Sequence, residues 1–115
     1  MLGNLFKRIR PNMQWQLNPV SWTLKAPGTG EVLLTASEMA VVSRFAESPG
    51  QAVSREQLVE AMGADWSTYD PRRLEVMMRR LRVKLEEALG YTPPIHTVRG
   101  TGYAFNASII VTETH

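Results

Sequence analysis

The residues from 71 to 89 constrain the fold more than any other part of the chain. Asp70 followed by Pro71 is a typical helix start, because aspartate caps the first free amides and proline has no amide to leave unpaired. One apolar seam follows at helical spacing: Leu74, Met78, Leu81, Leu85 and Ala88. At about 100° per residue, four positions project from the opposite side: Arg73, Val76, Arg80 and Val83. Three further arginines lie along the flanks: Arg72, Arg79 and Arg82. The sequence therefore predicts a long helix that is buried on one side and cationic on the other.

Basic residues are unevenly distributed along the chain. The 115 residues carry 13 lysines and arginines against 11 acids, so the net charge is only +2. Acids outnumber bases between Pro11 and Tyr69, whereas six bases fall between Arg72 and Lys84. Taken alone, such a cluster is typical of a solvated helix face. Together with the features below, it favours a partner that presents negative charge on one side.

Two shorter helices are predicted upstream, and each begins with a capping box. In the first, the Thr35 hydroxyl can accept from the Glu38 amide while the Glu38 side chain reaches back. Ser54 and Gln57 have the same spacing at the start of the second. A proline-glycine pair ends the first helix and a glycine ends the second. Several apolar side chains are expected to face the core: Met39, Val42, Phe45, Ala46, Leu58, Val59 and Met62.

Short strands are expected on both sides of these helices. Three stretches separated by turn residues predict a small antiparallel sheet: residues 15–17, 21–25 and 31–34. Near the other end, residues 95–98 and 103–105 flank the turn Arg99-Gly100-Thr101-Gly102. They predict a hairpin in which the glycines supply the positive φ that a tight turn needs. Residues 109–111 either add a further strand or trail off.

The order helix, helix, connection, basic helix and hairpin is typical of a winged helix-turn-helix protein. A helix about 10 Å across fits the major groove of DNA. Arginine forks match guanine edges bidentately, and a glycine-tipped hairpin can bring one cation to the neighbouring backbone or minor groove. We therefore predict an α+β fold with a small N-terminal antiparallel sheet, three helices and a C-terminal β-hairpin wing, which binds double-stranded DNA.

Several motifs resemble the C-terminal DNA-binding domain of OmpR/PhoB response regulators, and the resemblance covers residues 15–106. They are Leu34-Thr35 followed by Glu38, the run Pro49-Gly50 through Val53-Ser54-Arg55-Glu56-Gln57-Leu58, Arg79-Arg80-Leu81-Arg82 with Lys84-Leu85, and Thr97-Val98-Arg99-Gly100-Thr101-Gly102-Tyr103 with Phe105. The resemblance implies an N-terminal four-stranded sheet and assigns sequence reading to the third helix. It also implies a role in bacterial two-component transcription regulation and tandem homodimers on direct repeats, with half-sites about 10 to 10.5 base pairs apart.

The resemblance assigns a role to each matching position. Base readout falls to Arg73 and Arg80, while Val76 is placed to touch a thymine methyl group. Phosphate contacts, which fix register without reading sequence, fall to five residues: Arg72, Arg79, Arg82, Thr97 and Tyr103. Arg99 is expected to enter the minor groove, where narrow A·T tracts concentrate negative potential.

Three departures concern the surroundings of the third helix. Met77 stands where many members have a phosphate-contacting histidine, and Met62 replaces a frequent tryptophan. The connection before Arg72 is one residue longer than usual. In relatives this connection touches RNA polymerase, for which Trp66 or Tyr69 is a suitable anchor. Packing of Trp66 onto the core is the alternative.

The sequence also limits the other classes of function. Cysteine is absent and the two histidines are isolated, so we expect no metal site, no cofactor and no enzymatic activity. No apolar run is long enough to span a bilayer, so we expect a cytoplasmic protein. The alternative to sequence reading is a winged-helix interaction module whose cationic face docks an acidic partner such as an RNA polymerase subunit.

The chain divides into three predicted parts. Residues 1–14 are interpreted as a leader or linker, residues 15–106 as the winged-helix domain and residues 107–115 as a C-terminal tail. The leader alternates apolar and basic residues, so a poorly ordered end and a segment lying on a membrane surface or on DNA are both compatible with it. A stand-alone regulator, a piece of a receiver-containing regulator and the cytoplasmic part of a membrane-anchored relative all fit this division.

Overall fold

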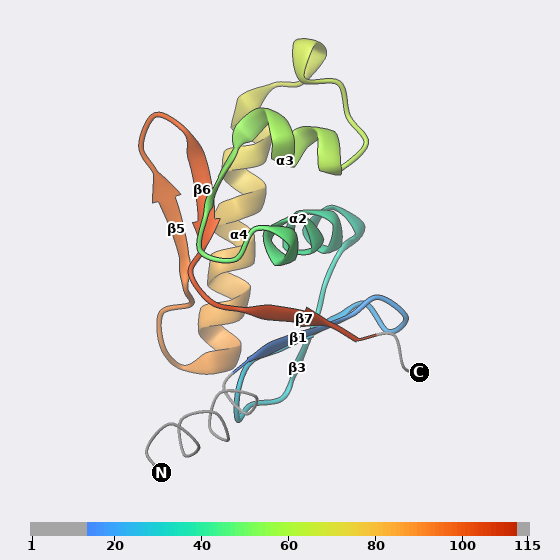
Figure 1. Cartoon of the computed structure of the whole chain (residues 1–115), viewed down its shortest axis with the longest axis vertical. Helices are drawn as coiled ribbons and strands as arrows, with labels where there is room; N and C mark the ends of the chain where they lie inside the picture. The colour runs from blue at the N-terminus through green and yellow to red at the C-terminus, as the bar shows by residue number, and fades with distance from the viewer. Residues whose placement is uncertain (1–13, 113–115) are drawn as a thin grey trace.

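A computed structural model of the chain describes residues 14–112, so the predicted leader lies almost entirely outside the described range. The described elements, in chain order, are β1 (Trp15–Asn18), β2 (Thr23–Lys25), β3 (Glu31–Leu33), α2 (Ala36–Glu47), β4 (Ala52–Ser54), α3 (Arg55–Ala61), the short 3-10 helix η1 (Trp66–Thr68), α4 (Pro71–Leu89), β5 (Ile95–Val98), β6 (Gly102–Phe105) and β7 (Ile109–Val111). Figure 1 shows α4 upright, with β5 and β6 on one side of it and α2 and α3 on the other. The predicted α+β winged-helix architecture is confirmed.

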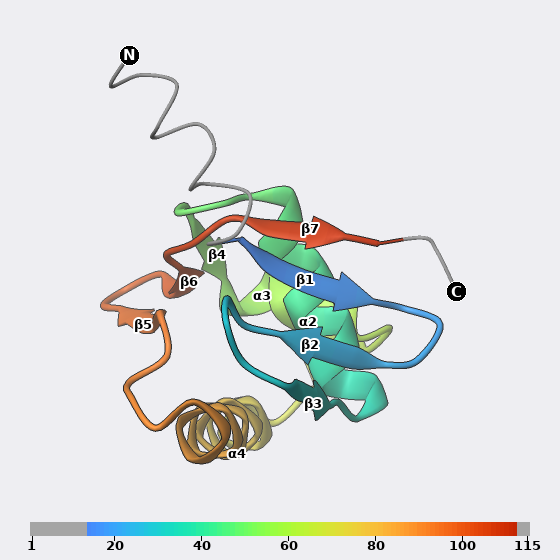
Figure 2. The same cartoon turned by 90° about the horizontal axis from the view of Figure 1, so that it is seen from below.

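The first sheet has four strands, but its fourth strand comes from the far end of the chain. The strand order is β3-β2-β1-β7, with the first three antiparallel and β7 parallel to β1 (Figure 2). Trp15 pairs with Ile109, which is buried in the core. Of the two alternatives left open for residues 109–111, the further strand is present, and it adds a parallel strand to the sheet that was predicted as antiparallel. Part of the predicted C-terminal tail is a strand, and the structured domain continues at least to Val111.

The turn between β1 and β2 shortens the second strand. The Asn18 side-chain oxygen accepts from the amides of Val20 and Ser21, at 2.9 and 3.2 Å. Trp22 follows with a φ of 60°, which is unusual for a residue with a side chain. The strand predicted from residue 21 therefore begins at Thr23.

Both predicted capping boxes are present. The Thr35 hydroxyl accepts from the Glu38 amide at 3.2 Å, and the Glu38 carboxylate accepts from the Thr35 amide at 2.9 Å. Ser54 and Gln57 make the same reciprocal pair, with both distances 3.0 Å. The predicted core residues of these helices divide into buried and half-buried sets. Val42, Phe45, Leu58 and Val59 are buried, whereas Met39, Ala46 and Met62 are half-buried at the edge of the core.

Helix α4 has the predicted start and length. The Asp70 carboxylate accepts from the Arg72 amide, and Gly90 ends the helix in a left-handed conformation. The first four residues of the predicted seam are fully buried: Leu74, Met78, Leu81 and Leu85. Ala88 is exposed instead, and Leu89 packs against the core in its place. A heptad-spaced seam rotates by about 20° per seven residues around a straight helix, so its last member has turned away from the core.

The wing is part of a three-stranded sheet, because β4 pairs with β6 on the side opposite β5. Strand β4 was not expected from the sequence. Gly100 has the expected positive φ of 79°, but Gly102 does not. A Cβ at Gly102 would lie 2.2 Å from the Val53 carbonyl oxygen, so this glycine is needed for the close passage of β4.

One core joins both sheets and helices α2, α3 and α4. Trp15 of the first sheet meets Phe105 of the wing sheet edge to face, with ring centroids 5.1 Å apart. Phe45 of α2 approaches the same ring at 6.0 Å. The wing is thus anchored at its base by aromatic packing, while its turn projects beside α4 (Figure 1).

Candidate nucleic-acid interface

The exposed face of α4 carries the predicted base-reading residues. Arg73, Val76 and Arg80 are all exposed, and their spacing of three and four residues keeps them on one face. Val76 is apolar, yet it is 36% exposed. This face therefore offers two guanidinium groups and one methyl-bearing surface to an outside partner.

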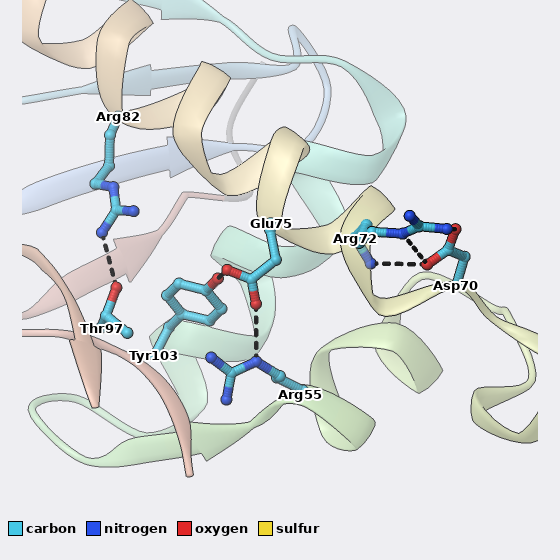
Figure 3. Close-up of polar contacts among 7 residues, drawn as sticks. All are labelled: Arg55, Asp70, Arg72, Glu75, Arg82, Thr97 and Tyr103. Carbon is cyan, nitrogen blue, oxygen red and sulfur yellow. Dashed lines mark hydrogen bonds and ion pairs between the residues drawn. The ribbon is translucent and has the colours of Figure 1, made fainter. Parts of the chain in front are cut away.

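Two arginines in the first turn of α4 are held by local contacts. The Arg72 guanidinium donates to both carboxylate oxygens of Asp70, at 3.3 and 3.2 Å, and these hydrogen bonds lower the pKa of Asp70 (Figure 3). The Arg73 guanidinium carbon lies 5.1 Å from the centre of the Tyr69 ring. Both side chains are thereby oriented while remaining open to solvent.

Arg79, Arg80 and Arg99 are exposed cations without such restraint. Within residues 14–112, no ion pair or side-chain hydrogen bond engages any of the three guanidinium groups. Arg99 begins the turn of the wing, directly before Gly100. These cations are free to bind an anion without first breaking an internal contact.

Arg82 links α4 to the wing. Its guanidinium donates to the Thr97 hydroxyl of β5 at 3.2 Å (Figure 3). The same group lies 5.9 Å from the centre of the Tyr103 ring on β6. Two predicted phosphate ligands, Arg82 and Thr97, are thus brought together by the fold.

Tyr103 does not occupy the position expected of it. The residue has no exposed surface, and its hydroxyl donates a 2.9 Å hydrogen bond to Glu75 of α4. Burial and the neighbouring carboxylate raise the pKa of the Tyr103 hydroxyl, so it stays protonated. In this conformation the ring belongs to the core and the hydroxyl is engaged by Glu75, so the phosphate contact expected of Tyr103 stays a prediction.

Sequence reasoning missed the pair formed by Arg55 and Glu75. The Arg55 Nε donates to Glu75 at 3.0 Å, and this hydrogen bond lowers the pKa of Glu75 and raises that of Arg55 (Figure 3). Arg55 also lies 5.4 Å from the Tyr103 ring centre. Glu75 is the only acid between Pro71 and Leu85, and this isolation within a basic helix was the available signal.

Lys84 does not belong to the cationic face. Its ammonium group donates to the Glu38 carboxylate at 2.6 Å and to the Leu33 carbonyl at 3.1 Å. Glu38 is buried, so Lys84 neutralises an internal charge. The arginines alone form the outward cationic surface of the helix.

A cleft of about 450 Å³ lies between the start of α2 and the first half of α4, and we call it the α2–α4 cleft. The lining combines apolar side chains, arginines and residues at the start of α2. The lining residues are Thr35, Ser37, Glu38, Met62, Tyr69, Arg72, Arg73, Val76, Met77 and Arg80. Both methionines that depart from the family pattern are among them. These two departures thus fall in one place, beside the base-reading face.

Trp66 and Tyr69 both pack against the core while remaining partly exposed. The connection that carries them is ordered by Asp65, whose carboxylate accepts from the amide and hydroxyl of Ser67 at 2.9 and 2.7 Å. The core contact expected as one alternative for Trp66 is present, and it leaves part of the ring accessible.

Residues 14–112 hold no cluster of three or more potential metal ligands, and no helix among them is long and apolar enough to cross a membrane.

Comparisons with known proteins agree on one family. The model of the family described as "Transcriptional regulatory protein, C terminal" matches residues 29–105. The regulatory protein VirG of Agrobacterium tumefaciens is 37% identical over 119 residues, which cover 92% of this chain and 44% of VirG. The chain thus spans less than half the length of that relative.

Solved structures give the same result. The C-terminal domain of the nisin resistance regulator NsrR, a lantibiotic response regulator, is 34% identical with a TM-score of 0.64, covering 79% of this chain and 89% of that one. The RstA DNA-binding domain of Klebsiella pneumoniae, solved in complex with the RstA box, is 30% identical with a TM-score of 0.60. The match covers 76% of this chain and 85% of RstA.

Proposed function

The chain belongs to the family of OmpR/PhoB-type C-terminal domains of transcriptional regulatory proteins, and from this premise we propose that it recognises specific sequences in double-stranded DNA. The family consists of DNA-binding domains of transcription regulators and not of enzymes. The observation that carries the proposal is the pairing of an exposed arginine face on α4 with a wing whose turn begins at an exposed Arg99.

In this proposal α4 enters the major groove. Arg73 and Arg80 read base edges, because a guanidinium fork matches the two acceptors of guanine, and Val76 contacts a thymine methyl group. Arg72, Arg79, Arg82 and Thr97 hold phosphates on the flanking strands. All of these residues except the half-buried Arg82 are exposed, and this exposure and the complex of RstA with its DNA box support the assignment.

The wing is proposed to place Arg99 in the adjacent minor groove. The tight turn at Gly100 keeps the tip narrow, and the Arg99 side chain is exposed. A·T-rich sequence at this position is expected to bind best, because its narrow minor groove attracts a guanidinium group.

The chain is further proposed to bind direct repeats as a tandem homodimer. Half-sites then lie about one helical turn, roughly 10 to 10.5 base pairs, apart. An operator consisting of one isolated half-site, or of an inverted repeat, would contradict this arrangement.

RNA polymerase is proposed as a second partner through the connection between α3 and α4. Trp66 and Tyr69 present part of their rings there on an ordered backbone, which suits an aromatic anchor in a protein interface.

A second candidate function is docking of an acidic protein instead of DNA. The α2–α4 cleft favours it, because both methionines, Met62 and Met77, and arginines line it, and this chemistry fits an acidic segment with an apolar anchor. Salt dependence is expected for both functions. Discrimination between DNA sequences is expected only for the first.

The experiment that tests the proposal is a selection of bound sequences from a randomised duplex pool at about 0.15 M salt, near physiological ionic strength. Enrichment of a repeated motif supports a sequence-reading regulator. If the folded protein enriches no motif, its function is instead nonspecific DNA binding or protein docking.

A further inference from the structure

The carboxylate of Glu75 joins three elements around the proposed DNA-binding surface. One oxygen accepts from Arg55 at the start of α3, at 3.0 Å. The other accepts from the Tyr103 hydroxyl on strand β6, at 2.9 Å. Glu75 itself belongs to α4, so its side chain connects α4 to α3 and to the wing (Figure 3).

A second contact ties the other wing strand to the same helix. Arg82 of α4 donates to Thr97 of β5 at 3.2 Å. Thr97 and Tyr103 are direct partners across the hairpin. Both ties therefore meet at one rung of the wing, two residues before Arg99, and together they fix the hairpin against α4.

A carboxylate at this position disfavours DNA binding because of its negative charge. Glu75 lies among the arginines of α4 and its side chain is 43% exposed, so its negative charge opposes the approach of phosphates. The hydrogen bonds from Arg55 and Tyr103 hold its pKa low, so the charge is permanent at neutral pH. Because the ion pair is partly exposed, it adds little to folding stability. The contact therefore needs another explanation than stability or attraction of DNA.

We propose that Glu75 is a positioning residue for the wing: through Tyr103 it sets the hairpin so that Arg99 and the arginines of α4 engage DNA at the same time. This proposal rests on the proposed function. Preorganisation increases affinity because less freedom is lost on binding. Simple electrostatics predicts the opposite outcome for a neutral substitution, since removing the charge would tighten binding.

The test is a set of double-mutant cycles on the full chain, using the duplex most enriched in the pool selection. Glu75→Gln is combined with Arg99→Ala and, separately, with Arg80→Ala, and dissociation constants are measured by fluorescence anisotropy. We expect Glu75→Gln to weaken binding and the cost of Arg99→Ala to shrink by about threefold or more in its presence, which is a coupling of ordinary size for connected residues. The cycle with Arg80 is expected to be additive.

Two further variants separate positioning from charge and from loss of structure. Glu86→Gln removes the same charge from an exposed position near the end of α4, and it is expected to leave affinity unchanged or slightly tighter. Tyr103→Phe removes only the hydroxyl tie and is expected to reproduce the coupling with Arg99. It also replaces Glu75→Gln as the test if thermal melting shows that the latter does not fold.

The outcomes distinguish this inference from the proposed function. Equal or tighter binding by Glu75→Gln, or additivity with Arg99→Ala, would overturn the positioning role while leaving sequence-specific DNA binding intact. Failure of the wild-type chain to enrich any sequence is instead a failure of the proposed function itself.

Discussion

Lys84 donates a 2.6 Å hydrogen bond to Glu38, whose carboxylate is buried at the start of α2. The two residues lie on different helices, and the same ammonium group also reaches the Leu33 carbonyl of β3. A basic residue within a DNA-binding motif thus serves to hold the domain together.

Replacement of Lys84 by methionine is therefore expected to reduce stability more than DNA affinity. Glu38 would keep its hydrogen bond from the Thr35 amide but lose its counter-charge, at a cost of about 1–3 kcal/mol in the free energy of unfolding. Urea unfolding measures this cost, and anisotropy under conditions where both proteins are folded measures affinity. A large loss of DNA affinity with unchanged stability would show that Lys84 contributes to DNA binding and not to the stability of the domain.

Arg80→Ala and Arg79→Ala are expected to have different effects on DNA affinity and sequence specificity. Loss of a bidentate base contact by Arg80 should cost about 1–3 kcal/mol and relax specificity at one base pair. Loss of a phosphate contact by Arg79 should weaken all sequences similarly and reduce the salt slope of log K by about one. Titrations against the selected duplex and its single-base variants at several salt concentrations distinguish the two. An even loss across sequences for Arg80→Ala would disprove its role in base readout.

Gly102→Ala is expected to destabilise the wing sheet by about 2 kcal/mol or more, because the added methyl group would lie 2.2 Å from the Val53 carbonyl oxygen. Gly30→Ala is the matched control, since nothing lies within 4 Å of a Cβ there. Thermal melting of the two variants gives the comparison. Similar melting temperatures would mean that β4 moves aside at little cost.

Acid is expected to weaken the domain through Glu75. Its folded-state pKa lies below the ordinary value of 4.5, chiefly because of Arg55 and then Tyr103. A carboxyl group with a lowered folded pKa contributes stability above its unfolded pKa and loses that stability as the pH falls through the folded pKa. The loss therefore begins near pH 4.5 and grows below it.

Urea unfolding from pH 7 to pH 3 tests this, with Glu75→Gln as the comparison. The wild type should lose slightly more stability than the variant below pH 4.5, by a small amount because the ion pair is partly exposed. Parallel curves would show that the Arg55 and Tyr103 contacts do not persist in solution.

Trp66→Ala is expected to lower transcription activation while leaving DNA affinity unchanged, if the connection before α4 contacts RNA polymerase. The ring also packs against the core, so a moderate loss of stability should accompany the change. Transcription with purified polymerase, run beside anisotropy on the same preparation, separates the effects. Equal losses of transcription activation and DNA binding would show that Trp66 does not contact RNA polymerase.

Local chemistry explains why most of the fold was predictable. The capping boxes at Thr35 and Ser54 and the Asp70-Pro71 start depend on residues within one helical turn, so their spacing is visible in the sequence. The buried seam of α4 also follows from its period until its rotation exposes Ala88.

Contacts between distant segments explain what could not be predicted. Strand β4 has three residues and exists because β6 pairs with it, and the sequence around Val53 carries no strand pattern of its own. Glu75 could be noticed as an isolated acid, but neither Arg55 nor Tyr103 is near it in the sequence. The burial of Tyr103 likewise depends on elements that only the folded chain brings together.

The parallel pairing of β7 with β1 affects how the domain is completed during protein synthesis. Trp15 emerges from the ribosome long before Ile109, its partner in the sheet. Until β7 has been translated, β1 has no neighbour on that side, and such an open edge invites pairing with other chains. A nascent chain therefore has an unpaired edge on β1 for nearly the whole time that residues 14–112 are being translated. That edge is closed only when β7 pairs with β1, late in the folding of these residues.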